Sequence, residues 1–208
     1  MLLVIVIILL IVSIVGGRLY ILSKVTSGNK ISSNLQSKSA LVVLDVQNDT
    51  LSIKEYKNKD TLIKNINSAI AYANDNSLDI IYTKQAFSNP LDKLLSSGLY
   101  VRNKKGSELS QQLLVLSSNI YEKERTDAFS NADFENYLLE QEITTLYIVG
   151  ADASACVYKT ALAGINRDYE IIVLKDCIFS VNEKMFNQAI DNYKRNNIEI
   201  QYLKDFIK

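Results

Sequence analysis

The sequence of 208 residues contains no histidine, and this absence removes several classes of functional site. Histidine is the usual general base beside a catalytic serine or cysteine, and it is a common zinc ligand. Only two cysteines are present, too few for a disulfide framework. Basic and acidic residues balance at 23 each, so no strongly basic face is available for nucleic acid. We therefore expect no Ser-His or Cys-His pair, no zinc site built on histidine and no nucleic-acid partner.

Charge is also missing from the first 17 residues, which are almost entirely apolar. A helix over residues 2–22 is long enough to span a bilayer if Arg18 extends toward the lipid headgroups. The rival interpretation is a cleaved signal peptide. That would need a basic segment before the apolar run and a small-residue cleavage site after it, and the sequence has neither. The sequence thus predicts an uncleaved transmembrane helix over residues 1–22.

The charges that follow this helix indicate its orientation. Positive charge beside a membrane span favours the cytoplasmic side, so we expect a single-pass membrane protein whose large domain is cytoplasmic. Residues 23–39 are polar and serine-rich without periodicity, which is typical of a flexible linker. Residues 40–208 are enough for one well-cored domain. The cations that precede the first acidic residue are Arg18, Lys24, Lys30 and Lys38.

Within residues 40–208, continuous apolar runs alternate with stretches of helical periodicity. This alternation predicts an α/β fold, a parallel sheet covered by helices on both faces. The segment 86–105 is expected to be a long loop that forms either a lid or a contact between the subunits of a homo-oligomer. The predicted strands are 40–44, 78–83, 119–122, 146–149, 170–174 and 199–203. The predicted helices are 60–74, 107–116, 131–141, 183–196 and one that begins near Ser154.

Three residues with reactive side chains stand where predicted strands end, at the edge of a parallel sheet where ligands bind. Asp45 closes the first strand in LVVLDVQND, and Lys123 closes a short strand in NIYEKERTDAF. Cys156 lies near the start of the helix that follows the run LYIVG, where the helix dipole favours an acidic thiol. Together they suggest a nucleophilic site. Asp45 would accept the thiol proton, Lys123 would stabilise anions and Cys156 would attack a carbonyl carbon.

Each of these residues also has a simpler interpretation. A cysteine at a strand-to-helix junction is often a small packing residue, and an aspartate after a strand often caps a turn. Lys123 lies in a run of charges that is normally solvated. Cys177 has no acid and lysine assigned to it, so we expect it to be a packing residue. The order and context of the three residues together nevertheless favour a nucleophilic site.

Three segments in this order resemble the motifs of the isochorismatase-like cysteine hydrolases: LVVLDVQND, K-x-R-x-x-AF and G-x-x-x-x-x-CVYKTA. The resemblance covers residues 40–180 and implies a Rossmann-like three-layer α/β/α domain. It also implies an Asp45–Lys123–Cys156 triad that cleaves an amide-type C–N bond through a thioester intermediate. No cofactor is expected.

The resemblance further implies a cis peptide after the motif's glycine, here between Ala151 and Asp152. We expect the backbone N–H groups of Asp152 and Cys156 to form the oxyanion hole. The sequence departs from the family at Ala153, where members commonly carry threonine. It also lacks the histidine of the nicotinamidase metal site after the second strand, so zinc is not expected. Isochorismatases proper lack the cysteine, so Cys156 favours amidase chemistry.

Four further residues are candidates for the substrate pocket. Gln47 and Asn48 follow Asp45 and either orient it, touch substrate or only form a turn. Phe129 either lines the pocket or packs in the core, and Tyr100 of the long loop is a lesser candidate that either reaches the crevice or stays outside it. We expect a hydrolase of a small amide, carbamoyl or ureido compound. The alternatives are a non-catalytic relative that binds a ligand or partner at the membrane and, ranked last, a redox-responsive protein.

Overall fold

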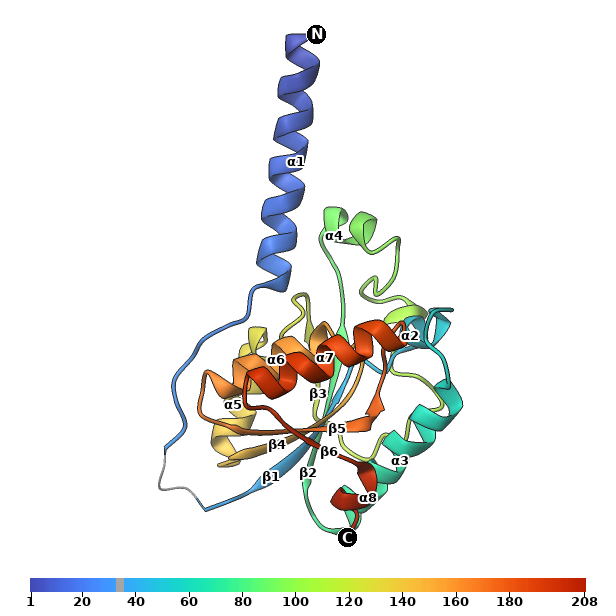
Figure 1. The fold of residues 1–208 in the computed structure, drawn as a ribbon, viewed down its shortest axis with the longest axis vertical. Helices are drawn as coiled ribbons and strands as arrows, with labels where there is room; N and C mark the ends of the chain where they lie inside the picture. The colour runs from blue at the N-terminus through green and yellow to red at the C-terminus, as the bar shows by residue number, and fades with distance from the viewer. Residues whose placement is uncertain (33–35) are drawn as a thin grey trace.

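The computed structural model describes residues 1–32 and 36–208. Within them, six parallel strands form one sheet in the order β3-β2-β1-β4-β5-β6 (Figure 1). Continuous apolar runs form these strands because both faces of the sheet are covered, as is usual for parallel sheets. The strands are β1 (Ser39–Leu44), β2 (Asp79–Gln85), β3 (Ile120–Lys123), β4 (Thr145–Gly150), β5 (Glu170–Ile178) and β6 (Glu199–Gln201).

Helices connect the strands and divide the core into two layers. Along β1, Leu41 and Val43 pack toward α3 and α8, whereas Val42 and Leu44 pack toward α5, α6 and α7. Alternate side chains of a strand point to opposite faces, so the sheet separates two apolar clusters. The predicted three-layer α/β/α architecture is confirmed. The helices are α1 (Leu2–Ser23), α2 (Asn48–Ser52), α3 (Lys59–Asp75), α4 (Pro90–Leu95), α5 (Ala132–Glu140), α6 (Cys156–Ile165), α7 (Glu183–Arg195) and α8 (Leu203–Phe206).

The predicted helix over residues 107–116 is wrong. Only a 3₁₀ turn, Lys105–Ser107, touches this range, and the chain then runs on without a helix. Its backbone pairs instead with the segment after β1: Ser110 N donates to Val46 O at 2.9 Å, and Asn48 N donates to Glu108 O at 3.0 Å. These tertiary hydrogen bonds use groups that a helix would need, and they outweigh a weak local helical preference.

Two smaller differences occur at the ends of elements. The predicted last strand, 199–203, ends at Gln201, and a short helix begins at Leu203 because that side chain and Phe206 pack into the core beside α3. The long loop 86–105 contains α4, which Asn89 caps through its side chain. Pro90 occupies the first helical position, where its missing N–H costs nothing.

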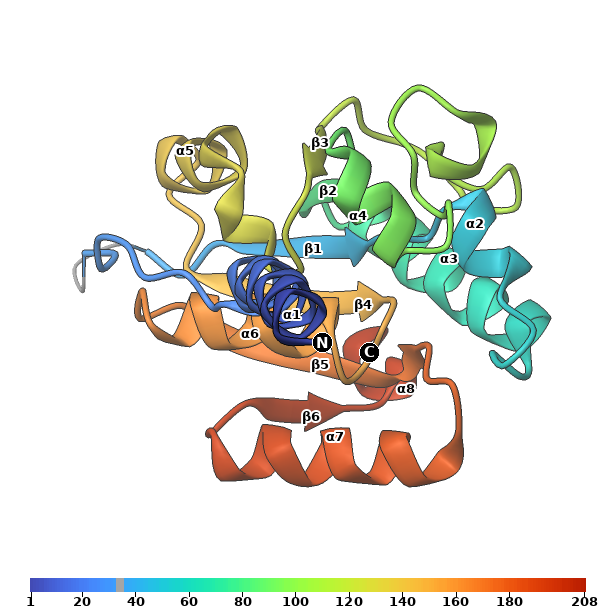
Figure 2. The ribbon, with the colours of Figure 1, turned by 90° about the horizontal axis from the view of Figure 1, so that it is seen from above.

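Helix α1 projects away from the sheet, and none of its residues is buried (Figure 1). Figure 2 looks along this helix onto the domain. Two contacts fix its carboxyl end: Arg18 Nε donates to Asp92 Oδ1 at 2.8 Å, and Thr126 N donates to Leu22 O at 3.0 Å. Arg18 was expected to reach toward the lipid headgroups, but its side chain forms an ion pair with Asp92, a buried residue of α4.

The segment after α1 makes several contacts with the domain. Thr26 N donates to the buried Asp127 Oδ2 at 2.7 Å, and Thr26 O accepts from Arg167 Nη1 at 3.2 Å. Further along, Ile31 N donates to Arg167 O at 2.9 Å. The flexibility of the predicted linker, residues 23–39, stays a prediction, and its residues 33–35 lie outside the described part of the chain.

Gly150 joins β4 to the loop that leads into α6. Its φ is +113°, and a Cβ atom placed there would lie 2.1 Å from Leu44 O of the neighbouring strand. Only glycine allows the two backbones to approach so closely at this backbone angle. This close contact between the backbones of Gly150 and Leu44 sets the path of the chain from the sheet to Cys156.

We therefore expect Gly150→Ala to lower the free energy of unfolding by about 3 kcal/mol or more, through strain and a backbone clash. Gly98→Ala is the matched control, because Gly98 also has positive φ (+81°) but nothing within 4 Å of the added Cβ. The control should cost about 1–2 kcal/mol. Thermal unfolding of both variants in detergent measures the difference, and equal losses would show that the approach to Leu44 is unimportant.

Candidate active site

The candidate site lies at the carboxyl edge of the sheet, where four strands present side chains to one another. Asp45 directly follows β1, Lys123 is the last residue of β3, and Cys156 is the first residue of α6 after β4. Strand β2 lies between β1 and β3 and contributes Thr83 and Gln85. The parallel topology therefore gathers residues that are far apart in the sequence.

Lys123 is at the centre of this group. Its Nζ donates to Asp45 Oδ2 at 2.7 Å and to Gln85 Oε1 at 2.8 Å, and it lies 3.4 Å from Cys156 Sγ. The lysine side chain is only 1% exposed. The solvated charge run that the sequence allowed is therefore wrong for Lys123. The structure brings Asp45, Lys123 and Cys156 together, as the motifs predict.

The carboxylate of Asp45 is held on its other side as well. Its Oδ1 accepts a hydrogen bond from Thr83 Oγ1 at 2.7 Å, and its backbone oxygen accepts one from Thr50 Oγ1 at 2.6 Å. The residue has a φ of +55°, a left-handed conformation that aspartate tolerates better than most residues. These constraints hold the carboxylate toward Lys123.

The electrostatics of Cys156 differ from the expectation of an acidic thiol. Burial, foremost, and the nearby Asp45 carboxylate raise the pKa of Cys156 to about 12, although Lys123 acts in the opposite direction. Burial, the largest influence, lowers the pKa of Lys123, but Asp45 and Cys156 together more than offset it, so the pKa is raised. The resting site is therefore a neutral thiol beside a lysine–carboxylate ion pair, and the predicted acidic thiol is wrong.

The turn between β4 and α6 surrounds the thiol with backbone N–H groups. The peptide between Ala151 and Asp152 is cis, as the family resemblance implies. In this turn, Ala153 N donates to Phe179 O at 2.8 Å and Val157 N donates to Asp152 O at 3.1 Å. Among the hydrogen bonds of the described residues, none uses the N–H groups of Asp152 and Cys156. These two donors remain available to a ligand.

A cavity of about 250 Å³ opens over the thiol. Tyr100 reaches it from the long loop, and its hydroxyl lies 3.2 Å from Thr50 Oγ1. Sequence reasoning missed Gln85, Tyr56 and Ile53. Gln85 lies two residues beyond the predicted end of its strand, and the other two lie in a segment without periodicity, so only the folded chain reveals them. The cavity is lined by Asp45, Ile53, Tyr56, Gln85, Tyr100, Ala151, Asp152, Ala155 and Cys156.

Three predicted pocket residues lie outside this cavity. The side-chain amide of Gln47 is fully buried and donates to Gln85 O at 2.9 Å and to Ser107 O at 2.6 Å. Asn48 Nδ2 donates to Lys105 O at 2.7 Å. Phe129 packs in the core at 5.1 Å from Phe134, measured between ring centroids. Gln47 and Asn48 thus fasten the surrounding loops, and the structure does not bring these three residues to the thiol.

The metal site of nicotinamidases does not fit this chain. The described residues include no group of three or more Cys, Asp or Glu side chains placed to hold a metal ion. The segment after β2 reads AFSNP and offers no imidazole. We derive no step through a metal, and activity without a metal stays a prediction.

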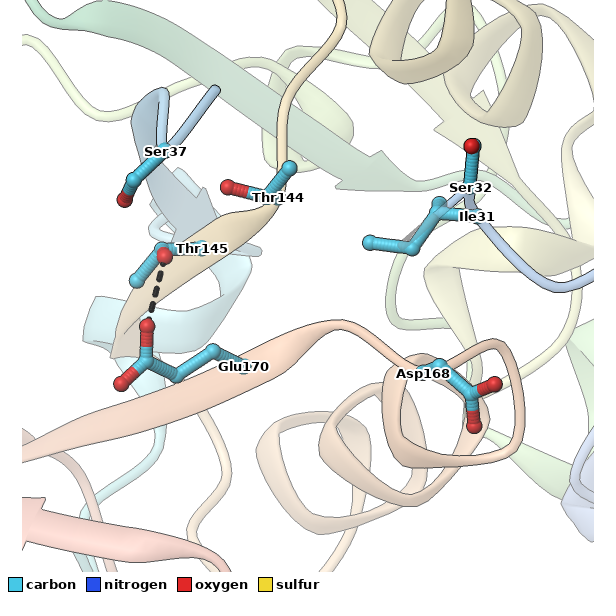
Figure 3. A pocket seen from close by; sticks show the side chains of 7 residues that line it. All are labelled: Ile31, Ser32, Ser37, Thr144, Thr145, Asp168 and Glu170. Atoms are coloured by element: carbon cyan, nitrogen blue, oxygen red, sulfur yellow. Dashed lines mark hydrogen bonds between the residues drawn. The ribbon is translucent and has the colours of Figure 1, made fainter. Parts of the chain in front are cut away.

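A second cavity, of about 340 Å³, lies at the opposite edge of the sheet (Figure 3). It includes the first residues of β4 and β5, Thr145 and Glu170, whose side chains hydrogen-bond at 2.8 Å. Among the described residues, its lining contains hydroxyl and carboxyl groups but no cysteine or lysine. The described lining of this cavity therefore offers no thiol nucleophile.

The raised pKa of Cys156 gives a testable pH dependence. We expect its alkylation by iodoacetamide to accelerate by about tenfold per pH unit up to the limit of folding, because the reactive thiolate is scarce below the pKa. Peptide mass spectrometry separates this from Cys177, which is fully buried and should react far more slowly. A rate that levels off below neutral pH would mean that the thiol is acidic after all.

Comparison with known proteins places these features in a family. An uncharacterized isochorismatase family protein, PncA, of Bacillus subtilis (strain 168) is 30% identical over 101 residues, which are 45% of this chain and 55% of that protein. This match spans only about half the length of that curated relative. Among solved structures, an isochorismatase-like hydrolase of Alkaliphilus metalliredigens has a TM-score of 0.71 at 21% identity, covering 82% of this chain and 95% of the other.

N-carbamoylsarcosine amidase of Thermoplasma acidophilum is similar to the same extent, with a TM-score of 0.69 at 22% identity. The similarity covers 80% of this chain and 96% of the amidase. At these identities the structural likeness shows the fold. The isochorismatase domain family itself matches residues 39–203, from the start of β1 to the start of α8. The chain therefore belongs to the isochorismatase family.

Proposed function

We propose that the protein is a cysteine hydrolase that cleaves the C–N bond of a small amide, carbamoyl or ureido compound. The observation that carries this proposal is the position of Lys123 Nζ, 2.7 Å from Asp45 Oδ2 and 3.4 Å from Cys156 Sγ. One buried cation thus contacts both a proton acceptor and a nucleophile. Membership in a family that includes an amidase among its solved structures supports the same chemistry.

In the first half-reaction, Cys156 Sγ attacks the carbonyl carbon of the substrate while its proton passes to Asp45. The neutral resting thiol makes this transfer concerted with attack, because a free thiolate would be costly beside the carboxylate. Lys123 remains positive and offsets the charge that develops on sulfur and oxygen. The free N–H groups of Asp152 and Cys156 receive the carbonyl oxygen as it becomes an oxyanion.

The tetrahedral adduct then collapses, which completes the first half-reaction. The C–N bond breaks, Asp45 returns the proton to the leaving nitrogen, and ammonia or an amine departs. The acyl group remains on Cys156 as a thioester. In the second half-reaction, Asp45 takes a proton from water as the water oxygen attacks the thioester carbonyl. The C–S bond then breaks, Asp45 returns that proton to the sulfur, and the thiol is regenerated as the acid product leaves.

The proposal predicts a clear contrast between the two cysteines. Cys156→Ala should lower ammonia release from a primary-amide substrate by about 10³-fold or more, because the nucleophile is lost. Cys177→Ala is the matched control and should keep nearly full activity, because Cys177 is buried in the core between α3 and the sheet. Ammonia release by the full chain in detergent, screened over amides, carbamoyl compounds and ureas, is the measurement. Equal activity of the two variants would contradict the nucleophile assignment.

We further propose that α1 anchors the protein in a membrane. Among the described residues it is the one helix long and apolar enough to cross a bilayer, and a signal sequence is the alternative interpretation of such a helix. The contacts of its carboxyl end with Asp92 and Thr126 favour an uncleaved anchor, since those loops use α1 as a structural partner. The cations that follow favour a cytoplasmic domain.

Anchoring predicts that the full chain sediments with membranes and resists extraction by carbonate. In intact cells, added protease should leave the domain uncut, because the domain faces the cytoplasm. Permeabilised cells provide the control and should show cleavage. Recovery of a shortened soluble protein would favour a cleaved signal peptide, and cleavage in intact cells would reverse the orientation.

A further inference from the structure

The cavity over Cys156 contains a carboxylate that the proposed hydrolysis does not use. Asp152 lines this cavity, and its Oδ1 accepts hydrogen bonds from Ser154 N at 2.8 Å and from Ser154 Oγ at 2.6 Å. The other oxygen, Oδ2, is buried and accepts no direct hydrogen bond among the described residues, although the hydroxyl of Tyr56 lies near this carboxylate. A buried carboxylate oxygen without a donor is costly, so such an atom in a cavity indicates a ligand that supplies the donor.

The charges around the cavity make Asp152 different from Asp45. Each of the two contributes a carboxylate to the lining, but Asp45 is neutralised by Lys123 at 2.7 Å. In the described part of the chain, Asp152 belongs to no ion pair. The cavity therefore carries one uncompensated negative charge, which attracts cations and repels anions.

The residues that line the cavity beside Asp152 limit the size and polarity of the rest of the ligand. Tyr56 borders the same cavity, with its ring packed 5.4 Å from the Phe179 ring, measured between centroids. Burial, foremost, raises the pKa of Tyr56, and the Asp152 carboxylate raises it further through its charge and its closeness to the hydroxyl, so this hydroxyl stays protonated at neutral pH. Ile53 and Tyr100 add apolar surface. The space of about 250 Å³ admits only a small molecule.

We propose that Asp152 Oδ2 is a specificity-determining acceptor that binds a cationic or N–H-rich group of the substrate. This inference rests on the proposed hydrolysis at Cys156, and it narrows the substrate to a small amide that also carries an ammonium, amidinium or ureido group. The ammonium or N–H group donates to Asp152 Oδ2 while the scissile carbonyl faces the thiol. Anionic amides are disfavoured, because they bring a second negative charge to the same wall.

Two methanethiosulfonate reagents of opposite charge test this without a known substrate. The full chain in detergent is treated with the 2-aminoethyl or the 2-sulfonatoethyl reagent, and labelling of Cys156 is timed by peptide mass spectrometry. In the wild type the cationic reagent should react faster. Asp152→Asn keeps the shape and an acceptor for Ser154 but removes the charge, so the ratio of the two rates should fall on the order of tenfold.

Asp191→Asn is the matched control, because it removes an exposed carboxylate on α7 outside the cavity lining and should leave the ratio unchanged. Asp152→Ser serves as a second variant, with the melting temperature of each compared with the wild type. An unchanged ratio in folded Asp152 variants, or no reaction of Cys156 with either reagent, would overturn the proposal. Ammonia release by the wild type is scored separately, so a failure of the hydrolase proposal is distinguishable.

Discussion

The buried ion pair between Lys123 and Asp45 is the constraint on which the rest of the site depends. Both side chains are nearly inaccessible, at 1% and 5% exposure, so each charge is tolerable only because the other is present. Strand β2 lies between the strands that end at Asp45 and Lys123, and its residues Thr83 and Gln85 form further hydrogen bonds with the pair. Removing one partner of such a pair costs about 3–5 kcal/mol. The site is thus part of what stabilises the carboxyl edge of the sheet.

Much of this arrangement could be predicted from the sequence because it depends on strand order. Apolar runs and helical periodicity locate the strands, and a parallel sheet brings Asp45 and Lys123 to the same edge. The acidic thiol expected for Cys156 was wrong, because a helix terminus is visible in the sequence whereas burial is not. Gln47 was misplaced for a similar reason. Its position next to Asp45 suggested the pocket, but in a tight turn adjacent residues point in different directions.

The loops at the carboxyl edge of the sheet contact α1 as well as the candidate site. Asp92 and Thr126, which contact α1, belong to the loops that follow β2 and β3, and the same loops surround the candidate site. The loop with Asp92 also contributes Tyr100 to the cavity. The carboxyl end of α1 and the candidate site therefore lie at the same edge of the sheet.

The sequence departs from the family pattern at Ala153, which lacks the hydroxyl of the usual threonine. The backbone N–H of Ala153 still donates to Phe179 O at 2.8 Å, so the turn that positions the thiol is intact.

The central claim is that Cys156 carries the acyl group between the two half-reactions. Rapid acid quenching during turnover of an amide substrate, followed by peptide mass spectrometry, tests it most directly. We expect the peptide containing Cys156 to gain the mass of the acyl group and to lose it in hydroxylamine. Steady release of ammonia with no acyl group on Cys156 at any time, or with the acyl group on another residue, would contradict it.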